Sequence, residues 1–351
     1  MMKKGIILIA ALFLFSGCWD NVEIENRNFA LVLGIDAADE EAAQYGNAHF
    51  RFSAAKACFR GDDEVNIDPA ARGQTLIEAI HNFDARSSRK LFLGQAKAIV
   101  LSSALLEDEK LFRETLNVIE NSNEIDRAIT ILATEAELPQ IINAHPQNET
   151  KPGYYLVNFN LLAKKSGGRS FQKNFDYMMA ELRATDNTLI PLVQKEDDDI
   201  KVEGALVIKN YHLAGKLDGT ELRGVLWAED RACEGAVLTT DDHISMTVRR
   251  HRGALYFSEA AGRLCCIIDV RVQGEVKQGA AYKLQSEYER IITQEIKETV
   301  NKLQSELEVD AFHLKTALWK QQHSLYKRYA GDWAESFINM EIIPRVRCEI
   351  I

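Results

Sequence analysis

The sequence lacks an excess of basic residues, and after its first 17 residues it lacks any long hydrophobic run. Of 351 residues, 42 are Lys or Arg and 52 are Asp or Glu, so the formal net charge is −10. Nucleic acid attracts a basic surface, so this balance argues against nucleic acid as a partner. It also argues against broad electrostatic adhesion to anionic lipid. No stretch after residue 17 reaches the roughly 20 apolar residues that a membrane-spanning helix needs.

Catalytic motifs are also missing from the sequence. It contains no G-x-S-x-G, no Walker A loop, no H-E-x-x-H and no G-x-G-x-x-G. Asp241-Asp242-His243 precedes a predicted strand, where a turn is commoner than a metal site. The acidic run at 197–199 is typical of a solvated linker. We therefore expect no enzyme activity, no metal and no cofactor other than the covalent lipid on Cys18 that is described next.

The first residues of the sequence have the pattern of a secretory leader that ends at a cysteine. Lys3 and Lys4 precede an apolar run over residues 5–15, and Ser16 and Gly17 precede Cys18. A basic start, an apolar core and small residues before a cut site form a signal peptide. The lipoprotein pathway needs a thiol after the cut, because diacylglycerol alkylates that thiol before cleavage. We predict a signal peptide at 1–17 and lipidation at Cys18, the alternative being an uncleaved anchor with an incidental cysteine.

Lipid on Cys18 accounts for attachment to a membrane. One acyl chain binds only marginally, whereas the two chains of a diacylglycerol give a stable anchor. Loss of Lys3 and Lys4 with the leader takes the net charge from −10 to −12, so we expect the lipid to supply the attachment. The mature chain is then expected on the outer face of a membrane, without crossing it.

Five cysteines remain beside the lipidated one, and an odd number cannot pair fully within one chain. None belongs to a CxxC motif. We interpret most of them as small apolar core residues, with one disulfide left open. The cysteines concerned are Cys58, Cys233, Cys265, Cys266 and Cys348.

The apolar pattern predicts two structured regions after a short polar tether at 18–28. Residues 29–195 read as β-β-α-β-α-β followed by further helices, which suggests mixed α/β structure. A polar break with two prolines at 144–153 divides this region into two small units. The charged run at 195–199 is the best candidate for a linker to the C-terminal α+β domain at 200–351.

The C-terminal region combines strands with a long amphipathic helix. An apolar stripe at helical spacing predicts this helix over 281–307, and a second helical piece covers 309–329. The last strand alternates cleanly over 340–350, and Pro344 within it indicates an edge strand or a bulge. The sequence therefore predicts an α+β fold of two to three mixed α/β domains with mostly antiparallel sheets.

Several motifs in order resemble one family along nearly the whole chain. The first is Gly17-Cys18-Trp19-Asp20, a lipobox with a Cys-Trp-Asp start. The others lie at 76–80, 89–94, 203–208, 213–221, 223–227, 319–320 and 332–337. On these motifs the chain resembles the Ger(x)C family, the lipoprotein C subunits of spore germinant receptors. Gln95 stands where the family has a histidine. Residues 309–314 lack the glycine-containing turn that follows the long helix in this family.

This resemblance implies a nutrient-sensing receptor on the outer face of the bacterial cytoplasmic membrane, here the inner spore membrane. It implies two integral membrane partners, an A subunit and a transporter-like B subunit, and a fold of three mixed α/β domains. The expected role is non-catalytic support of receptor assembly and spore germination. The rival interpretation is a stand-alone solute-binding lipoprotein that delivers a small ligand to a transporter.

One polar stretch is the best candidate for a partner or ligand loop. Its residues fall between predicted strands, where binding residues collect on loops. The alternative is a hairpin turn that uses the Asp-Gly pair. The candidate residues are Asp218, Gly219, Glu221 and Arg223. Nearby Trp227, like Trp319 and Trp333, is interpreted as a core anchor.

Overall fold

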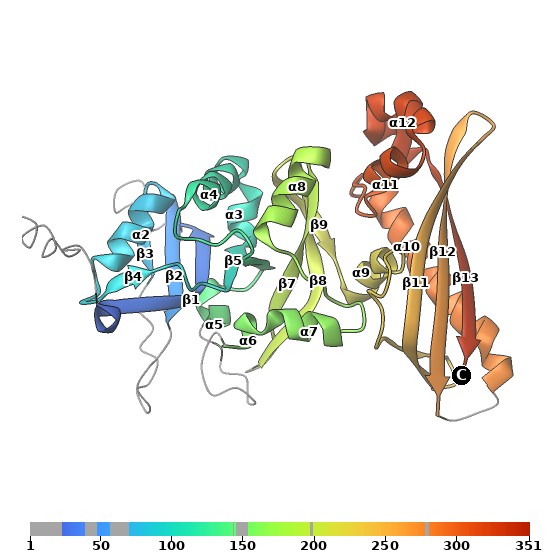
Figure 1. Ribbon diagram of the computed structural model, residues 1–351, viewed down its shortest axis with the longest axis horizontal. Coiled ribbons are helices and arrows are strands. Elements are labelled where there is room, and N and C mark those ends of the chain that lie inside the picture. Colours follow the sequence, from blue (N-terminus) through green and yellow to red (C-terminus); the bar gives the residue numbers. More distant parts are fainter. Residues whose placement is uncertain are drawn as a thin grey trace, which may run out of the picture.

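The computed structural model describes residues 23–38, 48–56, 70–142, 144, 154–196, 199–277 and 281–351. The predicted leader, Cys18, Cys58 and nearly all of the break at 144–153 lie outside these ranges. The described chain forms two sheets, one toward each end of an elongated molecule (Figure 1). A short 3-10 helix, η1 (Ile24–Asn26), leads into the first sheet.

The first sheet has nine strands in the order β3-β2-β1-β5-β6-β7-β8-β9, with β4 paired to β1. The pairs β1–β5, β5–β6 and β6–β7 are parallel, whereas β1–β2, β2–β3, β7–β8 and β8–β9 are antiparallel. The strands are β1 (Arg27–Ala37), β2 (Phe50–Lys56), β3 (Ala71–Gly73), β4 (Lys90–Phe92), β5 (Ala98–Ser102), β6 (Thr130–Thr134), β7 (Asn187–Glu196), β8 (Asp199–Lys209) and β9 (His212–Leu217).

The α+β prediction is confirmed, but mostly antiparallel pairing does not hold at the centre of this sheet. Every residue of β5 and β6 is buried. Parallel strands occur where helices cover both faces of a sheet, and such strands read as continuous apolar runs. The sequence at 98–102 and 130–134, which forms β5 and β6, has this largely apolar character and therefore carries a signal for a parallel centre.

Helices cover both faces of the first sheet. Side chains alternate between the faces, so Leu33 and Ile35 join one apolar cluster and Val32 joins the other. The first cluster includes residues of α2 (Leu76–Asp84), α3 (Ser103–Glu107), α4 (Glu109–Asn121) and α8 (Phe175–Thr185). The second includes residues of α5 (Leu138–Ile142), α6 (Tyr154–Val157) and α7 (Phe159–Lys165).

The two parts of the N-terminal region share this one sheet. Strands β6 and β7, on either side of the break at 144–153, are paired at a single position, Ala133 with Leu192. The predicted linker at 195–199 is wrong, because Glu196 pairs with Asp199 at the end of a β7–β8 hairpin. The boundary predicted at 195–200 therefore falls within a hairpin, and β8 and β9 belong to the first sheet.

The second sheet has the order β10-β11-β12-β13. Its strands are β10 (Val237–Thr239), β11 (Ser245–Ala260), β12 (Arg263–Val276) and β13 (Glu341–Ile350). The long helix α10 (Ala281–Ser305) falls close to its predicted range and packs on the inner face. Its crossover makes β12 and β13 parallel, as such pairs require a long connection. The other helices are α9 (Gly219–Leu226), α11 (Leu314–Gln321), α12 (His323–Tyr329), η3 (Ala330–Asp332) and α13 (Trp333–Ile338).

Several smaller predictions in this region can be compared with the structure. Pro344 lies on the edge strand β13, as expected. The four described cysteines are free and buried, in agreement with a core role. Trp227 and Trp333 are buried, but Trp319 is 53% exposed, because its neighbour Leu318 takes the inward position on α11. None of the helices in the described ranges combines the length and apolar character needed to cross a membrane.

Candidate functional site

The four residues predicted to form a partner or ligand loop lie at the start of helix α9. The Asp218 Oδ1 accepts hydrogen bonds from the backbone N–H groups of Thr220 (2.7 Å) and Glu221 (2.9 Å). The Glu221 Oε2 accepts one from the Asp218 N–H at 2.8 Å. This reciprocal arrangement is a capping box. The loop prediction is wrong because the Asp-x-x-Glu spacing, a helix-start signal, outweighs the Asp-Gly turn signal.

Helix α9 is fastened to α10 by a buried ion pair. The Arg223 guanidinium donates to the Glu295 carboxylate through Nη2, and through Nε at 3.0 Å. The Trp227 indole N–H donates to the same carboxylate at 2.8 Å. Burial opposes the charge on Arg223, but Glu295 outweighs burial and raises the pKa of the guanidinium. Arg223 is 5% exposed, so this side chain serves an internal contact.

The other predicted residues also make contacts within the chain. Both carboxylate oxygens of Glu221 lie 2.7 Å from the Lys302 Nζ on α10. A Cβ on Gly219 would overlap the side chain of Glu203. These contacts explain the sequence pattern without a binding partner. A role for the four residues in partner or ligand binding stays a prediction.

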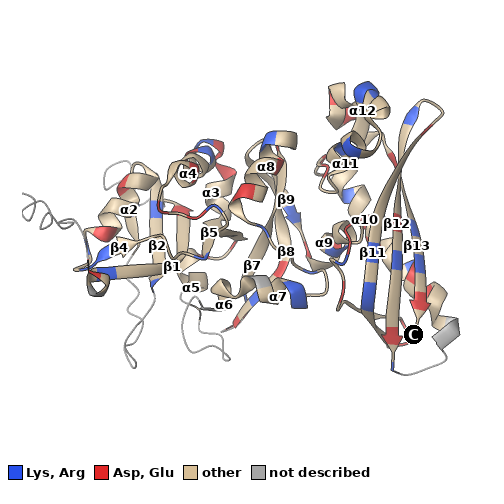
Figure 2. Cartoon of the chain, viewed as in Figure 1, with Lys and Arg blue, Asp and Glu red and all other residues tan. Residues whose placement is uncertain are grey.

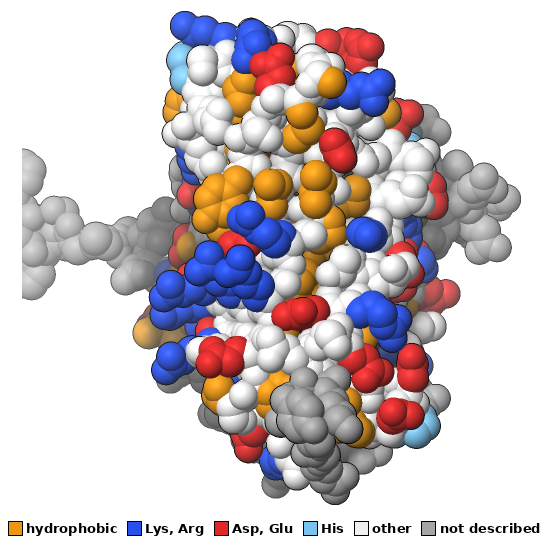
Figure 3. All heavy atoms as spheres, turned by 90° about the vertical axis from the view of Figure 1, so that its right-hand side faces the viewer, with side chains coloured by type: hydrophobic (Ala, Val, Ile, Leu, Met, Phe, Trp, Pro, Cys, Tyr) orange, Lys and Arg blue, Asp and Glu red, His pale blue; other side chains and the backbone are white. Residues whose placement is uncertain are grey.

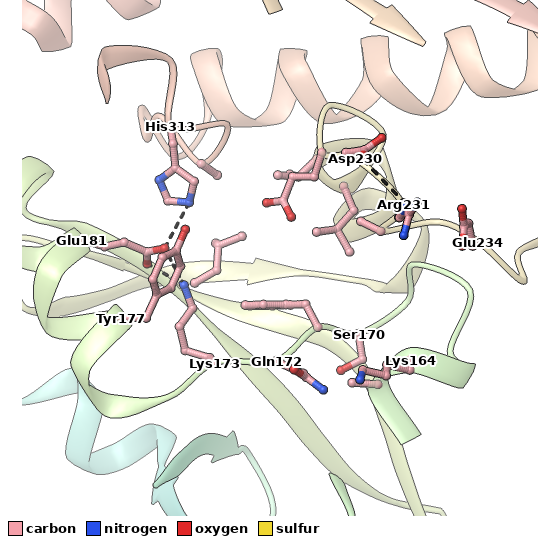
Figure 4. A pocket seen from close by; sticks show the side chains of 18 residues that line it. Lys164, Ser170, Gln172, Lys173, Tyr177, Glu181, Asp230, Arg231, Glu234 and His313 are labelled. Atoms are coloured by element: carbon pink, nitrogen blue, oxygen red, sulfur yellow. Dashed lines mark hydrogen bonds and ion pairs between the residues drawn. The ribbon is translucent and has the colours of Figure 1, made fainter. Parts of the chain in front are cut away.

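A pocket of about 560 Å³ lies where the two sheet regions meet (Figure 4). Helix α8 and the preceding segment form one wall, with Ser170, Lys173 and Glu181. Helix α9 with the chain that follows it and the turn before α11 form the other wall, with Asp230 and His313. The pocket therefore depends on both regions of the chain.

A buried ion cluster closes one end of the pocket. The Lys173 Nζ lies 2.6 Å from the Glu181 Oε2, and the His313 Nε2 lies 3.2 Å from the Glu181 Oε1. The Thr188 hydroxyl donates to the same carboxylate. Figure 4 shows Lys173, Tyr177, Glu181 and His313 gathered here, with His313 coming from the C-terminal region. The cluster thus joins α8 and β7 to the turn that starts α11.

Burial and charge act against each other in this cluster. Burial lowers the pKa of Lys173, although Glu181 partly offsets this effect. Burial alone would raise the pKa of Glu181, but hydrogen bonding to His313 and the charge of Lys173 lower it. Burial opposes a charge on His313, yet Glu181 outweighs burial and raises the pKa of this imidazole. The pKa shifts of Glu181 and His313 favour their charged forms, whereas the pKa shift of Lys173 favours its neutral form.

The remaining pocket wall combines polar and apolar side chains and carries one unsatisfied polar group. The Ser170 Oγ is buried and has no hydrogen-bond partner among the residues that the structure describes. Buried hydroxyls without a partner are uncommon, and one on a pocket wall favours a polar ligand or water there. Tyr177 and Phe171 place their rings 4.8 Å and 5.3 Å from the Lys173 Nζ. No group of three or more His, Cys, Asp or Glu side chains suited to a metal occurs among the described residues.

Sequence reasoning missed this cluster. The sequence patterns do not mark His313, Lys173 or Glu181 as residues of a site. One signal was present, because Glu181 shares a helix face with the apolar Met178 and Leu182. A carboxylate on an apolar face requires a buried partner. Its partners are Lys173 and His313, and no local pattern predicts the distant His313.

The two sheets, the long helix α10 and the pocket at their junction define a two-region α+β protein. Residues 20–195 match the family model described as Spore germination protein N-terminal domain, and residues 203–351 match Spore germination B3/ GerAC like, C-terminal. The chain belongs to this family of spore germination proteins. The resemblance found in the sequence motifs is thereby confirmed.

Relatives and a solved structure agree with this assignment. The chain is 20% identical over 366 residues to Spore germination protein B3 of Bacillus subtilis (strain 168), covering 99% of this chain and 97% of that protein. It is 25% identical over 224 residues to Spore germination protein GerQC of Bacillus cereus, covering 63% and 59%. The crystal structure of the GerBC protein matches the fold with a TM-score of 0.61 and 17% identity, over 91% of this chain and 96% of that one.

Proposed function

We propose that this chain is a lipid-anchored, non-catalytic subunit of a nutrient germinant receptor that supports receptor assembly and spore germination. The observation that carries the proposal is the family match, which runs through both halves of the chain. Near full-length similarity to Spore germination protein B3 supports it. The proposed partners are the integral membrane A and B subunits, and the proposed location is the outer face of the inner spore membrane.

The proposed anchor is diacylglycerol and a further acyl chain on Cys18. The support is the basic start, the apolar run and the Ser16-Gly17-Cys18 sequence. A Cys18→Ala variant should lose palmitate labelling and should leave the membrane fraction. Cys58→Ala is the matched control and should keep both properties. If Cys18→Ala remained as firmly bound as the native chain, attachment through partner proteins would replace the lipid anchor.

Deletion of the gene in a spore former tests the receptor role directly. Nutrient germination should fail or slow, and the levels of the A and B subunits should fall. Restoring the gene should restore both readouts. Normal germination with normal partner levels, in a strain without a second copy of the family, would contradict the proposal.

A second candidate is the solute-binding lipoprotein, which the 560 Å³ pocket favours because its volume suits a small polar ligand. Calorimetric titration of the purified chain with amino acids and sugars tests it. Micromolar binding of one solute, lost in a Ser170→Val variant, would favour this candidate. Neighbouring genes for an ATPase and a permease would add support, whereas genes for two multi-span proteins would favour the receptor subunit.

A further inference from the structure

Three arginines lie side by side on the outer face of the second sheet. Arg252 of β11 is in register with Arg271 of β12, which is in register with Arg347 of β13. All three are exposed, and basic positions occur at similar levels on the three strands (Figure 2). Cross-strand neighbours lie about 5 Å apart, and like charges placed opposite each other destabilise a sheet. A row of three arginines therefore opposes the stability of the strands that carry it.

The chain only partly neutralises this row. Two carboxylates lie near it. Asp269 contacts the Nε atoms of Arg271 at 3.3 Å and Arg345 at 2.7 Å. Glu349 lines the same hollow and accepts a hydrogen bond from the Gln273 side-chain amide at 2.7 Å. Neither Arg252 nor Arg347 has a carboxylate partner within the described ranges. A hollow of about 340 Å³ runs beside the row. Guanidinium groups are thus left free on a protein whose net charge is −10.

An apolar row crosses the same three strands. Tyr256, Ile267 and Ile343 are in register, four residues from the arginine row on each strand. Tyr256 is 49% exposed and Ile343 is 42% exposed. Four residues of strand correspond to about 13 Å. Figure 3 shows hydrophobic side chains gathered near the middle of this end of the molecule, with Lys and Arg side chains beside them.

The edge of the sheet is protected, which leaves the face as the open surface. Pro344 has no N–H to offer along the edge of β13, and the Cys348 N–H donates to Glu289 of α10 at 2.9 Å. Both features block the addition of a further strand. A partner would therefore dock across the strands and not beside β13.

We propose that this outer face, defined by the arginine row and the apolar row, docks an acidic segment of a partner protein. Carboxylates of the segment would pair with Arg252 and Arg347, and an apolar side chain would cover Tyr256 and Ile343. Charge complementarity selects the partner, because free guanidinium groups bind carboxylates in a bidentate manner.

The position of the face favours a protein over a lipid surface. Strand β1, which begins at Arg27, lies toward the opposite end of the molecule from the second sheet (Figure 1). Cys18 precedes Arg27 by nine residues, which span at most about 32 Å. With the proposed lipid on Cys18, the membrane holds that opposite end. The inference that a protein and not a lipid surface binds this face rests on the proposed anchor at Cys18. The inference that the bound group is anionic rests on the arginines alone.

Fluorescence anisotropy with labelled poly-L-glutamate tests the surface in vitro on the folded chain without its leader. The native chain should bind at low salt, and Arg252→Gln with Arg347→Gln should weaken binding by about tenfold or more. The matched control, Lys110→Gln with Lys297→Gln, removes the same charge from exposed positions on α4 and α10 and should bind as the native chain does. Tyr256→Ser should weaken binding to a glutamate–phenylalanine copolymer while sparing poly-L-glutamate.

Three outcomes would overturn the proposal. One is no binding of poly-L-glutamate to the native chain. Another is an equal loss in the arginine pair and in the lysine control, which would indicate a general charge effect. The last is binding only to phosphatidylglycerol vesicles, which would assign the face to a membrane. Melting temperature separates these outcomes from misfolding, since removal of Arg252 and Arg347 should leave it unchanged or raise it.

Discussion

Gly224 of α9 lies so close to Thr299 of α10 that a Cβ on Gly224 would overlap the Thr299 hydroxyl. The buried pair of Arg223 with Glu295 lies beside this point, and the pair of Glu221 with Lys302 lies on its other side. An ion pair on each side of this close contact therefore holds the two helices together. Helix α10 in turn packs on the second sheet, so α9 fixes the connection between the sheets to the C-terminal core.

Gly224→Ala should destabilise the chain by about 1–3 kcal/mol, because the added methyl group overpacks the contact with α10. Urea denaturation with an unchanged m-value gives the comparison. Gly331→Ala is the matched control, since nothing lies within 4 Å of a Cβ there. An equal effect at the two glycines would mean that helix approach does not limit Gly224.

Arg223→Met should cost about 3–5 kcal/mol, because it leaves the Glu295 carboxylate buried without its cation. Arg223→Met combined with Glu295→Leu should recover most of this loss, although the Trp227 indole N–H then loses its acceptor. The free energy of unfolding of the four chains of this cycle measures the coupling. Additive effects would contradict a specific pair.

His251 should make the fold sensitive to mild acid. Its Nδ1 accepts from the Cys233 N–H at 3.3 Å and its Nε2 contacts the Trp227 carbonyl at 3.0 Å, an arrangement for the neutral ring. Burial lowers the pKa of His251 to about 4, whereas the unfolded value is about 6.5. The unfolded chain then binds more protons between these values, so stability falls by about 3 kcal/mol as the pH drops through this range.

Thermal melts between pH 7 and 4 check this prediction. A His251→Gln variant should show a flatter decline below pH 6.5 than the native chain. His212→Gln, at an exposed position on β9, is the control and should follow the native profile. Parallel profiles for all three chains would remove His251 as the cause.

Protonation of His313 should stabilise the fold, whereas protonation of His251 should destabilise it. Its pKa is raised by Glu181 despite burial, so the contact stabilises the fold fully below the unfolded pKa of about 6.5. That contribution is lost as the pH rises through the raised value. The stability difference between the native chain and His313→Gln should therefore be largest below pH 6.5 and shrink as the pH rises above that value. A difference that stays constant with pH would show that packing, and not charge, explains the contact.

The sequence predicted best where one periodic pattern ran for many residues. The apolar stripe over 281–307 located α10 to within two residues at its end, and the alternation around Pro344 identified an edge strand. Both patterns reflect burial against one surface, which a local window records.

Prediction failed where two local signals competed or where contacts joined distant parts of the chain. At Asp218-Gly219 the turn signal and the helix-cap signal coincided, and the glutamate three residues later decided the outcome. The charged run at 195–199 had linker composition, yet strand pairing on either side made it a hairpin. Glu181 and His313 are 132 positions apart, so only the fold brings them together.

The β7–β8 hairpin has a consequence for how the chain can be divided. One family match ends at residue 195 and the other begins at 203, so the join between them falls inside this hairpin. A fragment ending near residue 196 would have β7 as an unpaired edge strand. The complementary fragment would begin with β8 and β9, which would lack the rest of their sheet. Such fragments should aggregate when made separately. Made together, they should reassemble through β7 and β8, which makes this hairpin a natural position for splitting the protein into two complementing pieces.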